Sequence, residues 1–242
     1  MQTKKMPVKR IIAYENVENV EFLMKDVPCQ SILSNNVEAA KINMGGYVLL
    51  DFGVEFHGGI KYAIEKITSF NTKLRIVFGE SVMEALSSIG FKNATNHHAI
   101  RDMTVPLAYY SQQYTGSTGF RFVKLEAVDG DIWLRHVDGI MEYLDIPYLG
   151  SFESNDELLN KIWKTAAYTV HLNIQDYIWD GIKRDRLVWI GDMHPETSTI
   201  SAVFGNCEQV TKSLDLIKSV TPPDEWMNDI PSYTMWWIII QR

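Results

Sequence analysis

The chain has 242 residues, is 46% hydrophobic and carries a formal net charge of −7. This length and apolar content suffice to bury one large core or two modest ones, which argues against a disordered chain. The acidic balance and the lack of a Lys/Arg-rich block argue against nucleic acid as a partner. Cys29 and Cys207 lie far apart and outside any Cys/His ligand spacing, so we expect neither a disulfide framework nor a metal site.

No apolar region of secretory length follows the basic first residues, and the sequence contains no run of about 18 apolar residues. We therefore expect neither a signal peptide nor a membrane-spanning helix in this chain, and no membrane partner. The compartment stays open between cytoplasm and periplasm, and the oligomeric state is unknown at this stage.

Short strands are predicted between about residues 42 and 148. Apolar and polar side chains alternate along residues 60–65 and 73–78, which is the period of a half-buried strand. The glycines at 58–59 and 116–119 supply turn chemistry between strands. Many short strands of this kind favour a sandwich.

The apolar period changes to three and four at Ser154, which predicts a helix. Ser154 and Glu157 have the spacing of a capping box at its start. We place the domain boundary near Gly150. The side chains expected on the buried face are Leu158, Leu159, Ile162, Trp163, Ala166, Val170 and Ile174.

Three further helical stretches are predicted. One begins beyond Asp192 and ends near Gly205, and the next turns Val210, Leu214 and Ile217 inward before Pro222-Pro223 stops it. The last, residues 232–242, is strongly apolar. Such faces need more helices to cover them, so we expect the natural protein to continue beyond this chain.

The sequence thus predicts an α+β multidomain chain. Its parts are an N-terminal segment (1–41), a β-sandwich domain (42–149) and the start of a helical domain (150–242).

Residues 179–192 carry the residue types that a sugar site requires. They include three carboxylates, two arginines and two tryptophans: Asp180, Asp185, Asp192, Arg184, Arg186, Trp179 and Trp189. Charged groups hydrogen-bond hydroxyls and indoles stack on sugar rings. Glycoside hydrolysis needs one protonated carboxylic acid and a second carboxylate, so a lone acid is insufficient.

This segment resembles the signature of family 78 α-L-rhamnosidases, which is an aspartate, then Arg-Asp/Glu-Arg-Leu, then Trp-x-Gly-Asp. Short motifs at 51–53, 78–80, 119–123 and 150–153 also resemble this family's β domain and helix entry, so the resemblance covers about residue 42 to the end. It implies a jelly-roll-like β-sandwich followed by the first helices of an incomplete (α/α)6 barrel. It also implies hydrolysis of terminal α-L-rhamnosides with inversion, a rhamnose-containing glycan or glycoside as partner, and no cofactor or metal.

By the same resemblance Asp185 is the general acid, and Asp180, Arg184, Trp189 and Asp192 bind the sugar. Two departures from the family pattern stand here. Asp185 occupies a position where the family usually has Glu, and residues 181–183 replace its Cys-Pro-Gln. The expected base is a glutamate further downstream that this sequence does not contain, so we expect residues 1–242 alone to be inactive.

Other interpretations stay open. The charged residues of 180–186 could form a solvated, salt-bridged loop, and Asp192 could serve as a helix N-cap. The chain could also be a non-catalytic carbohydrate-binding or structural module, or part of an (α/α)6 glycosidase of other specificity. Trp163, Trp236 and Trp237 lie in apolar segments predicted to be helical. We therefore expect them to be core residues rather than residues that stack on sugar rings.

Overall fold

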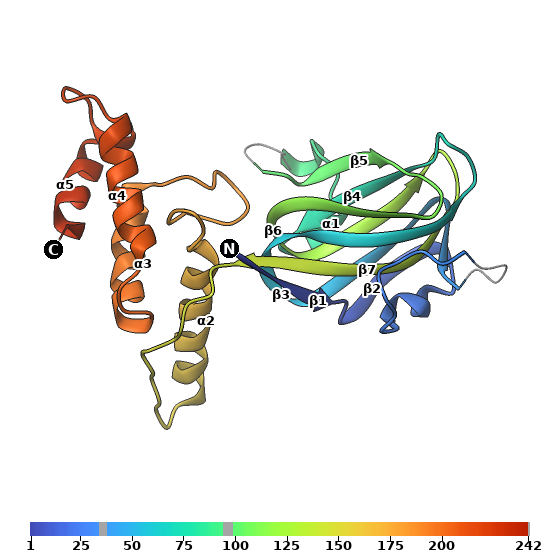
Figure 1. The fold of residues 1–242 in the computed structure, drawn as a ribbon, viewed down its shortest axis with the longest axis horizontal. Helices are drawn as coiled ribbons and strands as arrows, with labels where there is room; N and C mark the ends of the chain where they lie inside the picture. The colour runs from blue at the N-terminus through green and yellow to red at the C-terminus, as the bar shows by residue number, and fades with distance from the viewer. Residues whose placement is uncertain (34–37, 94–98, 242) are drawn as a thin grey trace. The chain divides into compact units, whose positions relative to one another are not determined.

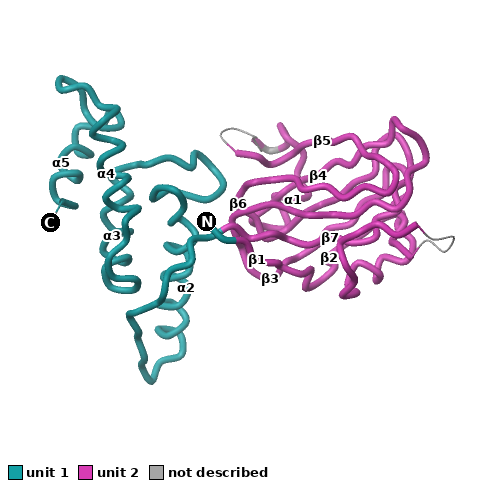
Figure 2. The backbone as a smooth tube through the Cα atoms, viewed as in Figure 1, with its two compact units in different colours: residues 1–2, 143–242 teal, residues 3–142 magenta. Residues whose placement is uncertain are grey.

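The computed structural model describes residues 1–33, 38–93 and 99–241. It divides into two compact units, which Figure 2 shows in different colours. Residues 3–142 form the first, here called the β unit, and residues 1–2 with 143–242 form the second, here called the helical unit. Within the described ranges, no helix combines the length and the apolar character needed to cross a membrane.

In the part of the β unit that the structure describes, there are seven strands with three short helices between them (Figure 1). The strands are β1 (Gln2–Pro7), β2 (Arg10–Glu18), β3 (Ala40–Ile67), β4 (Lys73–Gly79), β5 (Asp102–Pro106), β6 (Ser111–Val128) and β7 (Ile132–Tyr143). The helices are η1 (Val20–Met24), α1 (Val82–Leu86) and η2 (Phe91–Asn93).

The strands form one sheet in the order β1-β7-β3-β6-β4-β5, with β2 also paired to β3. The pairs of β3 with β2, β6 and β7 are antiparallel, as are those of β4 with β5 and β6. Ile132 of β7 lies opposite both Ile42 and Ile67, near the two ends of β3. The long strand β3 therefore bends back on itself. The expectation of a β domain is confirmed, but the expected short strands are wrong for β3 and β6, which have 28 and 18 residues.

The core of the β unit follows the alternation seen in the sequence. The alternating side chains Ile60, Tyr62, Ile64, Leu74, Ile76 and Phe78 are all fully buried. Phe56 and Phe120 pack in a tilted arrangement with ring centroids 4.5 Å apart, and Phe52 meets both rings edge-on. Burial of such side chains contributes roughly 1.5–3 kcal/mol each, so this core stabilises the sheet.

The predicted turns at residues 58–59 and 116–119 are wrong, because these glycines lie inside β3 and β6. A Cβ on Gly116 would come within 2.4 Å of the Gly59 Cα, and the β3–β6 register shifts between Gly58 and Gly59. The glycines thus allow a bulge where two backbones approach closely. The sheet also includes β1 and β2, which lie in the segment 1–41 that was set apart from the β domain.

The helical unit contains four α-helices and one short 3-10 helix among its described residues. They are α2 (Glu157–Asn173), α3 (Ile190–Val203), α4 (Glu208–Val220), η3 (Met227–Asp229) and α5 (Pro231–Ile240). Helix α3 packs against α2, α4 and α5 (Figure 1). The helices predicted from the apolar period are confirmed, and Leu214 and Ile217 are buried as expected.

Two details of α2 differ from the sequence prediction. Asp156 is the N-cap and accepts the Leu158 N–H at 2.8 Å, so the capping box at Ser154 is wrong. Leu158 and Ile162 are 64% and 53% exposed, because only the second half of α2 reaches the core. The residues buried on α2 are Ala167, His171 and Leu172.

Candidate functional site

The segment between α2 and α3, residues 174–189, carries most of the candidate site. Its beginning is held by backbone bonds, since Trp179 N–H donates to the Asn173 carbonyl at 3.0 Å and Ile174 bridges Ile178. The Ser213 hydroxyl on α4 accepts the buried Ile178 N–H at 2.9 Å. Although the segment lacks regular structure, these bonds fix it to two helices.

Asp180 closes the segment through two bonds to Leu187. The Leu187 N–H donates to the Asp180 carboxylate at 2.9 Å, and the Asp180 N–H donates to the Leu187 carbonyl at 3.0 Å. A carboxylate that accepts a backbone N–H makes a charge-assisted bond, which is stronger than a neutral one. Asp180 therefore has a structural task in addition to its predicted contact with sugar.

Asp185 lies at the tip of this closed loop in an unusual backbone conformation. Asp185 and Arg186 have φ values of 56° and 57°, and the Arg186 N–H donates to the Arg184 carbonyl at 2.7 Å. Two successive non-glycine residues in the left-handed region cost free energy that the surrounding bonds must offset. The Asp185 side chain is 19% exposed and lies 3.7 Å from the Arg184 Nε, while Arg184 is 69% exposed.

Trp189 and Asp192 lie at the entry of α3. The Trp189 ring meets the Tyr233 ring edge-on at 6.2 Å, and a Cβ on Gly191 would come within 2.2 Å of the Tyr233 ring. Gly191 therefore allows Tyr233 to approach. The N-cap is Trp189, not Asp192, which lies in the first turn of the helix with an exposed side chain. There the helix dipole stabilises its charge.

The charges of Asp185 and Asp192 act on Asp180. The pKa of Asp180 is raised, mainly by burial, with added contributions from the charges of Asp185 and Asp192, while its bond from Leu187 opposes the shift. The pKa of Tyr233 is also raised by burial and by Asp192 and Asp180. The structure thus brings Asp180, Asp185 and Asp192 into one electrostatic cluster.

The sequence analysis did not predict three residues of this region, which are Asn173, Glu196 and Asn228. Glu196 on α3 is 8% exposed and accepts a bond from Asn173 Nδ2 at 2.9 Å. Asn228 binds both sides of Trp189, since its Nδ2 donates to the Val188 carbonyl at 3.1 Å and its Oδ1 accepts the Ile190 N–H at 3.2 Å. The four-residue spacing from Asp192 to Glu196 was the available signal for Glu196.

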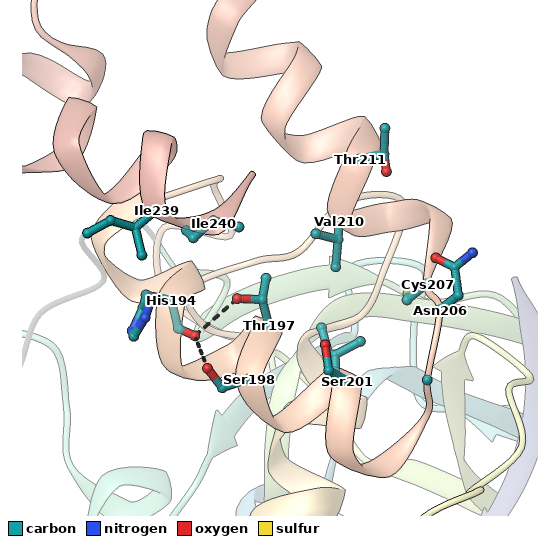
Figure 3. A pocket seen from close by; sticks show the side chains of 12 residues that line it. His194, Thr197, Ser198, Ser201, Asn206, Cys207, Val210, Thr211, Ile239 and Ile240 are labelled. Atoms are coloured by element: carbon teal, nitrogen blue, oxygen red, sulfur yellow. Dashed lines mark hydrogen bonds between the residues drawn. The ribbon is translucent and has the colours of Figure 1, made fainter. Parts of the chain in front are cut away.

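The cavity shown in Figure 3 does not contain the predicted site residues. It has a volume of about 420 Å³ and lies between α3, α4 and α5. Thr197 and Ser198 on its wall donate their hydroxyls to the His194 carbonyl, each at 3.0 Å. The candidate site therefore lies on the surface of residues 174–189 and the start of α3, outside this cavity. Among the described residues, no group of three His, Cys, Asp or Glu side chains could hold a metal ion.

Residues 147–240 match the family described as the bacterial alpha-L-rhamnosidase 6 hairpin glycosidase domain. This match covers less than half of the chain and lies within the helical unit. The expected resemblance to α-L-rhamnosidases is thus confirmed for these residues. An alpha-L-rhamnosidase of Formosa agariphila is 30% identical over 76 residues, which are 31% of this chain and 8% of that protein.

Solved rhamnosidase structures share the fold. The family 78 rhamnosidase of Bacillus sp. GL1 has a TM-score of 0.71 at 22% identity, over 91% of this chain and 23% of that chain. The rhamnosidase of Klebsiella oxytoca, solved with rhamnose bound, has a TM-score of 0.73 at 17% identity, over 99% of this chain and 51% of that one. The chain thus spans about half of the Klebsiella oxytoca protein and about a quarter of the Bacillus protein.

Proposed function

We propose that this chain is part of a glycoside hydrolase that cleaves terminal α-L-rhamnosides with inversion. The observation that carries the proposal is the cluster of Asp180, Asp185 and Asp192, held by a closed loop at the entry of α3 within an α-L-rhamnosidase family match. The substrate is a rhamnose-containing glycan or glycoside. A family match and a carboxylate cluster at one place support this function better than either would alone.

The proposal includes the finer architecture. The β unit corresponds to the jelly-roll-like sandwich, and the helical unit corresponds to the first helices of an (α/α)6 barrel. The connection between β7 and α2, residues 144–156, contains the proposed domain boundary near Gly150. The bent antiparallel sheet and the apolar helix faces left exposed on α2 support this assignment.

In the proposed mechanism Asp185 protonates the glycosidic oxygen. Asp180, Arg184 and Asp192 hydrogen-bond sugar hydroxyls, and Trp189 forms an apolar wall. A general acid must deliver its proton within hydrogen-bond reach of the glycosidic oxygen, so the position of Asp185 in the closed loop decides whether it can act. The base would be a carboxylate outside this chain, about 6.5–9.5 Å from the acid as in inverting enzymes.

The test is turnover of p-nitrophenyl α-L-rhamnoside by a polypeptide that joins this chain to the remaining helices of a six-hairpin domain. Asp185→Asn should lower kcat by about 10²–10⁴-fold while L-rhamnose binding persists, since general acid catalysis contributes that much. Unchanged turnover would remove Asp185 from the mechanism. The stereochemistry of the first product, read by NMR, tests inversion separately.

A non-catalytic sugar-binding module is the second candidate, because Asp185 is shorter than the Glu usual in the family. Calorimetric titration of the 242-residue chain with L-rhamnose separates the two. Binding that survives both Asp180→Ala and Trp189→Ala would place sugar recognition outside the candidate site and favour the second candidate.

A further inference from the structure

Glu196 is a buried carboxyl group for which the proposed mechanism has no use. It follows Asp192 by four residues, so both side chains lie on one face of α3. Its Oε1 accepts the Asn173 amide at 2.9 Å. Its Oε2 is buried without a hydrogen-bond partner. Among the described residues of the helical unit, Trp189 Nε1 is the other buried polar side-chain atom without such a partner.

Asn173 connects Glu196 to the sugar-binding segment. Asn173 is the last residue of α2, and its backbone carbonyl accepts the Trp179 N–H at 3.0 Å. Trp179 directly precedes Asp180. The two bonds of Asn173 therefore link α3, which carries Asp192, to the point where the Asp180 segment begins.

The surroundings of Glu196 favour its neutral form. Its pKa is raised to about 7 because the side chain is buried, and Asp192 and Asp180 add to the shift while the Asn173 bond opposes it. The titratable groups nearby are Asp192 on its own helix, Asp180 on the segment, and Tyr233 from α5, which faces the same two aspartates. A charged carboxylate with one buried oxygen unpaired is costly, and a proton relieves that cost.

We propose that Glu196 is a positioning residue of the candidate sugar site, holding the start of the Asp180 segment in place through Asn173. The link to sugar binding rests on the proposed function, whereas the positioning itself is measured without any ligand. Ionisation of Glu196 strengthens its bond with Asn173 but leaves a buried negative charge beside Asp180 and Asp192. Burial and this repulsion outweigh the stronger bond, so we expect the segment to be held less firmly above neutral pH.

The test is amide hydrogen exchange by NMR on the 242-residue chain. Glu196→Ala should accelerate exchange at Trp179 at least about tenfold, because the side-chain support of Asn173 is lost. Glu196→Gln retains an acceptor for Asn173 and should stay within about twofold of the native rate. Glu208 is an exposed carboxylate on α4, and Glu208→Ala with Glu208→Gln forms the matched control pair, expected to leave Trp179 unchanged.

Titration with L-rhamnose supplies the second readout. From pH 6 to pH 8 the affinity of the native chain should fall about threefold or more, and that of Glu196→Gln should stay level. The proposal would be overturned if exchange at Trp179 were unchanged in Glu196→Ala, or rose no more than exchange at Ile217 in α4. It would also be overturned if Glu196→Gln did not keep the native exchange rate at Trp179. If the native chain binds no rhamnose, the proposed function fails while exchange at Trp179 still decides the role of Glu196.

Discussion

Asp180 and Leu187 bond to each other twice, once through the Asp180 side chain and once through its backbone. The two bonds close the loop that contains Asp185 and its left-handed turn. This closure helps to hold the strained turn, since such backbone strain lasts only where the surrounding structure enforces it. Asp180 therefore positions Asp185 as well as presenting its own carboxylate.

The first prediction concerns this closure. Asp180→Ala removes the acceptor for the Leu187 N–H, so amide exchange at Leu187 should accelerate about tenfold or more, and binding of L-rhamnose should be lost. Asp180→Asn keeps a carbonyl acceptor and should preserve the exchange rate while weakening binding. Asp176 is exposed in the same segment, and Asp176→Ala is the control. Equal exchange rates at Leu187 in all four proteins would show that the side-chain bond does not hold the loop.

Much of this site could be predicted from the sequence, because its chemistry is concentrated in residues 179–192. The spacing of Asp180, Asp185 and Asp192 was enough to indicate a carboxylate cluster. The roles of Asp180 in loop closure and of Asp185 in the turn were not predicted, because hydrogen bonds to Leu187 and left-handed backbone angles have no sequence signature at this level. Asp192 was placed at a helix start, but as the N-cap rather than in the first turn. Glu196 was missed because its partner Asn173 lies on another helix.

The same contrast holds for the fold. Alternation predicted the buried strand residues, since the period of a strand is local. Gly58 and Gly116 were misread as turns, because a glycine that admits a crossing backbone looks the same in sequence as one that turns the chain. Leu158 and Ile162 were expected to be buried, but periodicity identifies an apolar face without telling what covers it.

The second prediction concerns the stability of the β unit in acid. Asp51 is fully buried, and burial opposes its charge, yet hydrogen bonds from Arg121 and Arg10 and from the Gly53 N–H outweigh that effect and hold its pKa well below its usual range. A carboxylate with a depressed folded-state pKa stabilises the fold above its unfolded pKa, here near 3.8, and this stabilisation is lost as the pH falls below it. The free energy of unfolding of the β unit should therefore decline steeply below about pH 4.

Hydrogen exchange of β3 amides measures this free energy for the β unit by itself. Asp51→Asn should lower it by about 1.5–3 kcal/mol at pH 7, because two partly exposed arginines lose their charged hydrogen-bond partner, and should flatten its decline in acid. Asp129 pairs with Lys73 at the surface, with side chains 54% and 47% exposed, and Asp129→Asn should cost less than about 1 kcal/mol. Equal losses for the two variants would contradict the assigned importance of Asp51.

The third prediction concerns Asn228, whose side chain bonds the backbone on both sides of Trp189. Asn228→Ala leaves the Val188 carbonyl and the Ile190 N–H without their partners and places alanine at a φ of 52°, where asparagine is better tolerated. The free energy of unfolding of the helical unit should fall by about 2–4 kcal/mol. Asn155→Ala, at an exposed position before α2, should change it by less than about 0.5 kcal/mol in the same urea titration. Matching curves for the two variants would mean that Trp189 is held by other contacts.

The last prediction concerns Glu196 and the pH dependence of stability. Its pKa rises from 4.5 to about 7 on folding, chiefly because the group is buried, so between these values the folded state binds more protons than the unfolded state. The free energy of unfolding must then fall as the pH rises from about 4.5 to 7 and level off above that range, with a total on the order of 3 kcal/mol. Glu196→Gln removes the ionisation but keeps an acceptor for Asn173, so its helical unit should be more stable than the native one at pH 8 and nearly equal to it at pH 4.5. Thermal melts at both pH values measure the difference, with Glu208→Gln as the control that should follow the native protein throughout. A Glu196→Gln variant less stable than the native chain at pH 8 would show that Glu196 is a satisfied carboxylate there, and the buried oxygen without a partner would need another explanation.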